Sequence, residues 1–195
     1  MKKIISSDIN RQDRLPPGQR WIEKPIVYDI KKVPEVDLPS FRFRIFGFVE
    51  SELIMSFDEI KKLEPIELIA DFHCVTTWSV KNILWEGVQT KELIKTCRPK
   101  ENAKYVIVHC REGYTTNFPL SYLFEEDSII AWKMNSMAIP RSNGYPLRIV
   151  IPKLYAWKSA KYVESIELVE QDIPGFWEER GYHMRGNPWL EERYQ

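Results

Sequence analysis

The chain has 195 residues with 28 basic and 28 acidic side chains, so its formal net charge is zero. A neutral surface gives no electrostatic reason for binding nucleic acid or an anionic membrane. Hydrophobic residues make up 44% of the chain and charged residues 29%, which is ordinary for a globular protein. The length predicts one core-forming domain, and no apolar stretch approaches the roughly 20 residues of a membrane span.

Residues 1–39 are rich in proline and charge and show no sustained hydrophobic period. They predict an extended N-terminal arm with turns near residues 16–18 and at Pro34, followed by a single domain over residues 40–195. Residues 1–20 are polar and lack the apolar centre of a secretory signal. The three cysteines, an odd number, favour reduced thiols over a disulfide framework. We therefore expect a cytoplasmic protein.

Alternating and apolar runs predict short strands along the rest of the chain. The first regular strand is expected at residues 41–49, where Phe41, Phe43 and Ile45 alternate with arginines. Similar runs predict further strands at residues 66–70, 105–108, 128–134, 146–151 and 163–169.

Two short helices are expected between these strands. Ser56 and Glu59 form a capping box, which predicts a helix through Leu63. Thr90 is expected to cap a second helix over residues 91–97. Because short strands outnumber helices and no regular strand–helix–strand alternation appears, the predicted fold class is α+β with mixed, mainly antiparallel sheets.

Two apolar strands end in the same dipeptide, His73-Cys74 and His109-Cys110. Two thiols and two imidazoles are a ligand set for structural zinc, but neighbours along a strand point to opposite faces and no short ligand knuckle is present. A nucleophilic Cys–His pair is the other local hypothesis, although it needs an orienting acid or amide that the sequence does not place. A lone cysteine mostly packs in a core, so the local pattern leaves Cys74 open.

Later segments carry polar groups suited to a heterocycle and a phosphate. Residues 113–120 bring hydroxyls and an amide into one predicted loop, which could bind a heterocycle or satisfy its own turn. Arg148, Lys158 and Lys161 could converge on a phosphate, or form a solvated charged face. The glycine patterns of P-loop and Rossmann nucleotide sites do not occur.

Separated motifs follow one another in a characteristic order. They are Cys74-Val-x-x-Trp-Ser, Trp85-Glu-Gly-Val, Gly113-Tyr-x-x-Asn-x-Pro-Leu, and Asn143-Gly-x-Pro-Leu-Arg-x-Val-x-Pro followed by Tyr-x-Trp-Lys-Ser-x-Lys161. In this order they resemble the sulfite-oxidase-fold molybdopterin oxidoreductases. The resemblance is greatest to the small sulfite-oxidase-like proteins, then to the catalytic subunit of periplasmic methionine-sulfoxide reductase, and it covers about residues 16–194.

The resemblance implies a sulfite-oxidase-type molybdopterin-binding domain with molybdenum and molybdopterin as cofactors. Cys74 would be the metal ligand and a catalytic residue, in agreement with the preference of soft thiolates for particular metals. Tyr114 matches a tyrosine placed near the metal-oxo group. The metal and its dithiolene would perform two-electron oxygen-atom transfer, while the protein supplies orientation and electrostatics.

The same resemblance gives a set of cofactor-binding candidates. Most match positions that hold the pterin and its phosphate; His73 and His109 are expected to act as core groups or as donors from behind the site rather than as metal ligands. The set is His73, Cys74, His109, Asn143, Arg148, Lys158, Ser159, Ala160 and Lys161. From the arm, Gln19 and Trp21 are further candidates, and in the tail His183 is a candidate for capping the pocket.

One departure from sulfite oxidases concerns the substrate. They carry an arginine just after the ligating cysteine, whereas this chain has Val75, Thr76, Thr77 and Trp78 there. Hydroxyls and rings favour a neutral sulfoxide or N-oxide over the sulfite dianion. One arginine reaching the pocket would restore an anion site. The candidates for that role are Arg111, Arg180 and Arg185.

No haem-attachment motif is present, so electrons are expected to come from, or go to, a separate partner. The substrate is expected to be a small molecule. Two alternatives stay open from sequence: a non-catalytic pterin-binding protein of the same fold, and a cofactor-free cysteine-dependent hydrolase. The retained Cys74 favours an enzyme, since a pure binder needs no metal-ligating thiol. Cys97 and Cys110 are expected to be structural.

Overall fold

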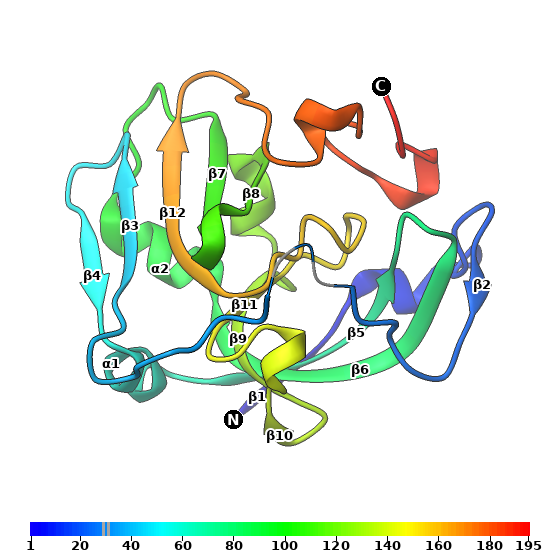
Figure 1. The fold of residues 1–195 in the computed structure, drawn as a ribbon, viewed down its shortest axis with the longest axis horizontal. Helices are drawn as coiled ribbons and strands as arrows, with labels where there is room; N and C mark the ends of the chain where they lie inside the picture. The colour runs from blue at the N-terminus through cyan, green and yellow to red at the C-terminus, as the bar shows by residue number, and fades with distance from the viewer. Residues whose placement is uncertain (29, 31) are drawn as a thin grey trace.

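The computed structural model describes residues 1–28, 30 and 32–195, and its strands form two sheets on different sides of the molecule (Figure 1). The larger sheet contains β1 (Lys2–Ile5), β2 (Arg20–Trp21), β5 (Ile66–His73), β6 (Trp78–Gln89), β9 (Ile129–Met134), β10 (Met137–Ala138) and β11 (Arg148–Val150). The smaller sheet contains β3 (Phe43–Gly47), β4 (Leu53–Met55), β7 (Tyr105–Cys110), β8 (Thr115–Pro119) and β12 (Val163–Val169).

The helices of the described residues are short. They are α1 (Phe57–Lys62) and α2 (Thr90–Cys97), with 3-10 turns η1 (Ser7–Asn10), η2 (Arg111–Gly113), η3 (Leu120–Phe124), η4 (Arg141–Asn143), η5 (Glu178–Arg180) and η6 (Pro188–Leu190). Among the described residues, none of these helices has the length and apolar character that crossing a membrane requires. The predicted α+β class with mixed sheets is therefore confirmed.

The centre of the larger sheet is the antiparallel hairpin of β5 and β6, in which His73 pairs with Ser79 near the connecting turn. Strand β6 also pairs with β9, and at that contact Gly87 leaves no room for a side chain. A Cβ atom on Gly87 would lie 2.1 Å from the carbonyl oxygen of Ile130. The glycine therefore lets β9 approach β6 beside a shift in their register.

The smaller sheet is mixed, because β12 runs parallel to β3 and antiparallel to β7. Strands β7 and β8 form a hairpin whose turn ends at Tyr114. Glu112 and Gly113 both have positive φ in this turn, at 67° and 75°. This left-handed stretch reverses the chain within a few residues and leaves Tyr114 at the edge of the sheet.

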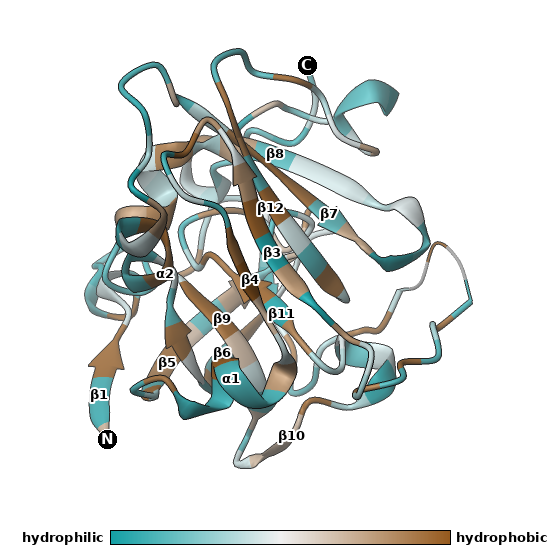
Figure 2. Ribbon diagram, turned by 90° about the vertical axis from the view of Figure 1, so that its left-hand side faces the viewer, coloured by the Kyte–Doolittle hydropathy of each residue, from teal (hydrophilic) through white to brown (hydrophobic). Residues whose placement is uncertain are grey.

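Apolar residues of the strands and helices form two main clusters. Ile45 of β3, Ile94 of α2 and Val108 of β7 belong to the first, and all three are fully buried. The second lies on β5, β6 and β9, where Leu68 and Ile129 are fully buried. The brown colour of β5 and β9 in Figure 2 follows this concentration of apolar residues in the strands.

Several local predictions are confirmed. Ser56 and Glu59 form the predicted capping box at the start of α1, and β12 has the predicted bounds. The prediction for Thr90 is wrong: Gln89 is the N-cap residue and makes no side-chain cap, while the Thr90 hydroxyl donates to the carbonyl oxygens of Leu123 and Ser128.

Other elements were not predicted. A strand, β1, precedes the expected first strand and pairs in parallel with β5, and β6 follows the turn after Cys74 for 12 residues. The predicted loop at residues 113–120 is mostly strand β8. These segments contain polar or interrupted patterns whose pairing is decided by the neighbouring strand.

Candidate active site

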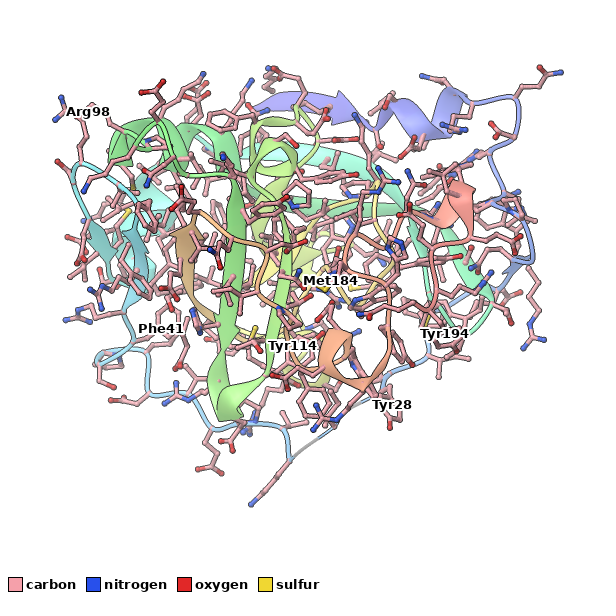
Figure 3. All side chains as sticks on the ribbon, turned by 90° about the horizontal axis from the view of Figure 1, so that it is seen from above. Tyr28, Phe41, Arg98, Tyr114, Met184 and Tyr194 are labelled. Atoms are coloured by element: carbon pink, nitrogen blue, oxygen red, sulfur yellow. The ribbon has the colours of Figure 1, made fainter. Side chains whose placement is uncertain are left out.

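A cavity of 470 Å³ lies where the two sheets, the N-terminal arm and the C-terminal tail meet. Cys74 reaches it from the β5–β6 turn, Tyr114 from the β7–β8 turn, and Arg148 from β11. The arm, which crosses the molecule from β2 to β3 in Figure 1, contributes Tyr28. Tyr28 and Tyr114 lie toward the same side of the molecule in Figure 3. The cavity is thus built from segments far apart in sequence.

Cys74 is the first residue of the tight turn that joins β5 to β6. Its backbone N–H donates to the carbonyl of Trp78 at 2.8 Å, and its carbonyl accepts from Thr77 at 3.1 Å. Thr77 has a φ of 76°, a conformation that a β-branched residue seldom adopts. The Sγ atom of Cys74 is 3.2 Å from the hydroxyl of Thr76. The hairpin therefore presents a half-buried thiol to the cavity, while Cys97 and Cys110 are buried elsewhere.

Positively charged side chains line another part of the cavity. Arg148 is buried, and its Nε and Nη1 atoms donate to the carbonyls of Ser159 and Asn143 at 3.0 and 3.1 Å. The guanidinium thereby joins the segment of Asn143 to the segment of Ser159, which also brings Ala160 and Lys161 to the wall. Burial beside aligned carbonyls fixes the orientation of this cation.

Lys161 lies next to a close backbone approach. A Cβ atom on Gly144 would be 3.0 Å from Cβ of Lys161, and Gly144 has a φ of 114°, so glycine is needed at this point. The ammonium of Lys161 donates to the carbonyls of Tyr28 at 2.9 Å and Ser142 at 3.0 Å. Lys161 therefore joins the arm to the wall that contains Arg148.

Tyr114 lines the cavity with its hydroxyl already engaged. The hydroxyl donates to the carbonyl of Trp157 at 2.8 Å. Burial raises the pKa of Tyr114 well above its usual value, and the nearby carboxylate of Glu178 adds to that shift. The side chain is therefore a neutral hydrogen-bond donor at ordinary pH.

Three predicted cofactor-site residues, His73, His109 and Lys158, do not line the cavity. His109 places Nε2 2.8 Å from a carboxylate oxygen of Glu167, and its ring stacks on Phe46. Lys158 is fully buried and donates to Glu178 and to the carbonyl of Asn117. Its position differs from the predicted one beside a phosphate because the residue turns inward to bind the C-terminal tail.

His73 lies directly behind Cys74 and is buried. Its Nδ1 atom is 2.8 Å from the hydroxyl of Ser79, so the ring turns toward β6. Burial lowers the pKa of His73 to about 4, which leaves the imidazole neutral at pH 7. Among the residues that the structure describes, the Cys74 thiol hydrogen-bonds Thr76 and the His73 ring hydrogen-bonds Ser79, so the hypothesis of a nucleophilic Cys–His pair gains no geometric support.

Sequence reasoning missed part of the wall. The arm contributes Ile26 and Val27, rather than the predicted Gln19 and Trp21, and the tail contributes Trp177. The signal available in the sequence was the pair of apolar residues Ile26 and Val27 in an arm that is otherwise rich in proline and charge. Apolar side chains that stay exposed can mark a binding surface.

The arginine candidates separate in the structure. Arg111 lines the cavity, with Nη1 3.6 Å from a carboxylate oxygen of Glu164. Arg180 and Arg185 do not line it, and neither does His183. Arg180 donates to the carbonyl of Phe176, whereas Arg185 pairs with Glu192.

The donor set matches a cofactor that brings its own sulfur ligands and a phosphate. Cys74 offers one thiol, and Arg148 and Lys161 offer cationic groups in the same cavity. Among the described residues, no cluster of three or more His, Cys, Asp or Glu side chains is arranged to hold a metal ion. One soft thiolate together with a phosphate-compatible wall fits molybdopterin with its molybdenum.

Comparisons with known proteins agree with this chemistry. The family described as "Oxidoreductase molybdopterin binding domain" matches residues 30–177. The uncharacterized oxidoreductase YuiH of Bacillus subtilis (strain 168) is 38% identical over 186 residues, which cover 95% of this chain and 94% of that protein. The protein-methionine-sulfoxide reductase catalytic subunit MsrP of Campylobacter jejuni is 27% identical over 76% of this chain, which spans only 57% of the length of MsrP.

The crystal structure of the sulfane dehydrogenase SoxCD from Paracoccus pantotrophus superposes with a TM-score of 0.66 over 71% of this chain and 40% of that chain. At 19% identity this likeness shows the fold alone. Fold and cavity together define an oxidoreductase of the sulfite-oxidase type. The chain belongs to the family of oxidoreductase molybdopterin-binding domains, and its cofactor is molybdenum with molybdopterin.

Proposed function

We propose that this enzyme transfers an oxygen atom to or from a small oxo-compound, and that it prefers a neutral sulfoxide or N-oxide to sulfite. The observation that carries the proposal is the placement of the half-buried Cys74 thiol in one cavity with Arg148 and Lys161. When bound, the molybdenum cofactor supplies the two-electron redox chemistry. The residues of the chain then bind, orient and shield the reacting groups.

Cys74 would be the ligand that the protein gives to the metal. Its thiol lies on a turn whose backbone is fixed by the hydrogen bonds to Trp78 and Thr77, so its direction is set before the cofactor arrives. A thiolate bound to a metal stays deprotonated. The hydroxyl of Thr76, 3.2 Å from the sulfur, can donate to that thiolate.

The cationic wall would hold the cofactor phosphate. Arg148 is already oriented by two carbonyls, and Lys161 can share its three donors between backbone oxygens and an anion. Asn143, Ser159 and Ala160 complete this wall of the cavity. The Ser159 hydroxyl oxygen accepts from the backbone N–H of Ile151, which leaves its own proton to donate.

The substrate preference rests on the aromatic wall near the thiol. Trp157, Trp177 and Tyr182 stand together, with ring centroids of the last two 4.9 Å apart. Rings and the Thr76 hydroxyl suit a neutral, polarisable oxo-compound. The relative named as a protein-methionine-sulfoxide reductase supports the sulfoxide. Arg148 and Lys161 are assigned to the cofactor phosphate, and Arg111 also lines the cavity, so Arg111 is the residue to test for binding an anionic substrate.

Electron transfer would involve a separate protein or carrier, because the sequence contains no haem-attachment motif. We also propose that the enzyme works in the cytoplasm, which its three free cysteines support. Fractionation of host cells with an antibody against the chain tests the location, and recovery outside the cytoplasm would contradict it.

The decisive experiment compares Cys74→Ala with Cys97→Ala in protein made with ample molybdate. Wild type is expected to contain about one molybdenum and one pterin per chain, as one thiolate site requires. Cys74→Ala should lose activity and Cys97→Ala should keep it, since Cys97 is buried away from the cavity. Full activity in Cys74→Ala would contradict the proposal.

Substrate preference is measured separately by steady-state kinetics. Sulfoxides and N-oxides with a low-potential donor are expected to give a higher kcat/KM than sulfite with an acceptor. If sulfite is the better substrate, Arg111→Ala should abolish that preference. A sulfite preference that survives in Arg111→Ala would place the anion site elsewhere.

A further inference from the structure

The turn that carries Cys74 is held from outside by both ends of the chain. Three of its carbonyl groups, those of Cys74, Val75 and Thr77, accept from donors on distant segments. The Nε2 atom of Gln19 donates to the carbonyl of Cys74 at 2.9 Å, and the backbone N–H of Arg20 donates to that of Thr77 at 2.9 Å. The guanidinium of Arg193 donates to the carbonyl of Val75.

Gln19 is itself fixed by a chain of hydrogen bonds behind the turn. The hydroxyl of Ser79 donates to Oε1 of Gln19 at 3.2 Å. Because the Ser79 hydroxyl donates its proton to Gln19, its oxygen accepts a hydrogen bond from the Nδ1–H of His73 at 2.8 Å. The carbonyl of Cys74 can only accept a hydrogen bond, and this fixes the Gln19 amide with its nitrogen toward Cys74 and its oxygen toward Ser79. Buried His73 thus reaches the thiol-bearing residue through two side chains.

Arg193 is similarly restrained. Its side chain is 14% exposed, its Nη2 donates to the carbonyl of Pro17 at 3.2 Å, and its guanidinium lies 5.1 Å from the ring centroid of Tyr155. Pro17 and Gln19 belong to the same stretch of the arm, so Arg193 ties arm, tail and turn into one unit. A planar fork with several donors is suited to joining two carbonyls at once.

We propose that Gln19 and Arg193 are positioning residues that set the direction of the Cys74 thiol. The turn needs such support because Thr77 is held at a positive φ, and strained backbone persists only where its surroundings determine it. Removing the Gln19 amide takes one of two donors from the carbonyl of Cys74, which keeps the backbone N–H of Thr77. Removing the Arg193 guanidinium takes the distant donor from the carbonyl of Val75, and either loss lets the turn relax. The consequence for the cofactor rests on the proposed role of Cys74 as metal ligand, whereas the consequence for the thiol does not.

The test measures the thiol directly in full-length protein produced without molybdate. Iodoacetamide alkylation of Cys74 is followed by mass spectrometry of the peptide that contains it. Gln19→Met keeps the length of the side chain but removes the donor, and it is expected to alkylate about fivefold faster, the factor that corresponds to one hydrogen bond of about 1 kcal/mol. Arg193→Met should give an increase of at least the same size.

Gln89→Met is the matched control. Gln89 also donates to a backbone carbonyl, that of Glu126 at 2.7 Å, but it lies at the other end of β6. Its alkylation rate is expected to equal that of wild type even if its melting temperature falls. If Gln89→Met raises the alkylation rate of Cys74 as much as Gln19→Met does, the proposal is overturned. A general loss of stability of the fold would then explain both increases.

Arg193→Lys separates charge from geometry. A lysine keeps the charge but cannot join two carbonyls with a rigid fork, so its alkylation rate should lie between those of wild type and Arg193→Met. Wild-type rates in both Gln19→Met and Arg193→Met would overturn the proposal. In protein made with molybdate, the same two variants should contain less molybdenum than Gln89→Met. The alkylation rates of the two variants can rise while their molybdenum content equals that of Gln89→Met. If Cys74→Ala then also retains molybdenum, the assignment of Cys74 as metal ligand is wrong, and the positioning role of Gln19 and Arg193 stands.

Discussion

At the scale of single residues, a fully buried ion pair lies beside the cavity. Lys158 and Glu178 are both buried, and the ammonium also donates to the carbonyls of Asn117 and Met184 at 2.6 and 2.7 Å. The Nε1 atom of Trp157 donates to the same Glu178 oxygen at 2.7 Å. Burial lowers the pKa of Lys158 to about 8 despite this carboxylate. The pair fixes the aromatic tail against β8.

We expect Glu178→Gln to destabilise the protein by about 3 kcal/mol or more, because it leaves a buried ammonium without its counter-charge. Urea unfolding at pH 7 measures the change. Glu179→Gln is the control, since Glu179 is exposed and its contact with Arg180 at 3.7 Å is a surface pair. Equal stability of the two variants would contradict the assigned role.

A second residue-scale prediction concerns the cationic wall. Arg148→Lys and Lys161→Ala should each weaken cofactor binding by about tenfold, the factor expected for losing a charge-assisted hydrogen bond. Pterin released on denaturation and measured by fluorescence reports occupancy. Lys153→Ala, which removes a pair with Glu125 outside the cavity, should keep its pterin. Wild-type pterin content in all three would remove Arg148 and Lys161 from the site.

At the scale of elements, what the sequence could predict depended on regular alternation. The apolar residues of β12 recur often enough that its bounds were predicted, although its register shifts between Val163 and Ser165. Strand β6 is interrupted by exposed Lys81 and by Asn82 at a φ of 53°. In β8, Thr116 and Asn117 are fully buried although polar, because they bind Glu178 and Asp172. A polar strand of this kind forms because of its partners elsewhere in the chain, and the hydrophobic periodicity of its own sequence does not predict it.

The contact of β6 with β9 gives a prediction for Gly87. Gly87→Ala would place a Cβ atom 2.1 Å from a backbone oxygen, so we expect a loss of about 3 kcal/mol or more, at the upper end of overpacking costs. Thermal unfolding followed by circular dichroism measures it. Gly181→Ala is the control, because nothing lies within 4 Å of its Cβ position. Its backbone has a φ of 91°, and this strain alone is expected to lower the free energy of unfolding by about 1 kcal/mol. A smaller loss at Gly87 than at Gly181 would show that β9 moves aside.

At the scale of the whole molecule, motif order predicted the family while the assembly of the cavity was not predictable. The motifs contain Cys74, Tyr114, Arg148 and Lys161, and all four line one cavity. Lys158 has the same charge and lies three residues from Lys161, yet it points into the core. The direction of such a side chain depends on a partner, here Glu178, that lies 20 residues further along the chain.

The N-terminal segment gives the whole molecule a pH dependence. Burial and the nearby Asp127 raise the pKa of Asp8 from 3.8 to about 6. The folded state therefore holds this proton more tightly than the unfolded state, and the resulting stability is present at low pH and lost as pH rises from about 4 through 6.

Asp8→Asn removes that loss. We expect the free energy of unfolding of Asp8→Asn to exceed that of wild type by about 1 kcal/mol at pH 7, after allowance for screening by solvent. At pH 4 the difference should be smaller. Urea titrations at the two pH values measure the difference. If Asp8→Asn raises the free energy of unfolding by the same amount at pH 4 and at pH 7, Asp8 does not titrate in this range.

The contacts of Arg193 also bear on how the enzyme is made. Arg193 follows Val75 by 118 residues, and the turn beside Cys74 lacks that contact until the ribosome has completed nearly all of the chain shown here. Both sheets consist of residues up to Val169, so they can pair while synthesis continues. If Arg193 orients the Cys74 thiol as proposed, the thiol takes its final direction after those sheets have paired. On the proposed role of Arg193, we expect cofactor insertion into this site to follow translation.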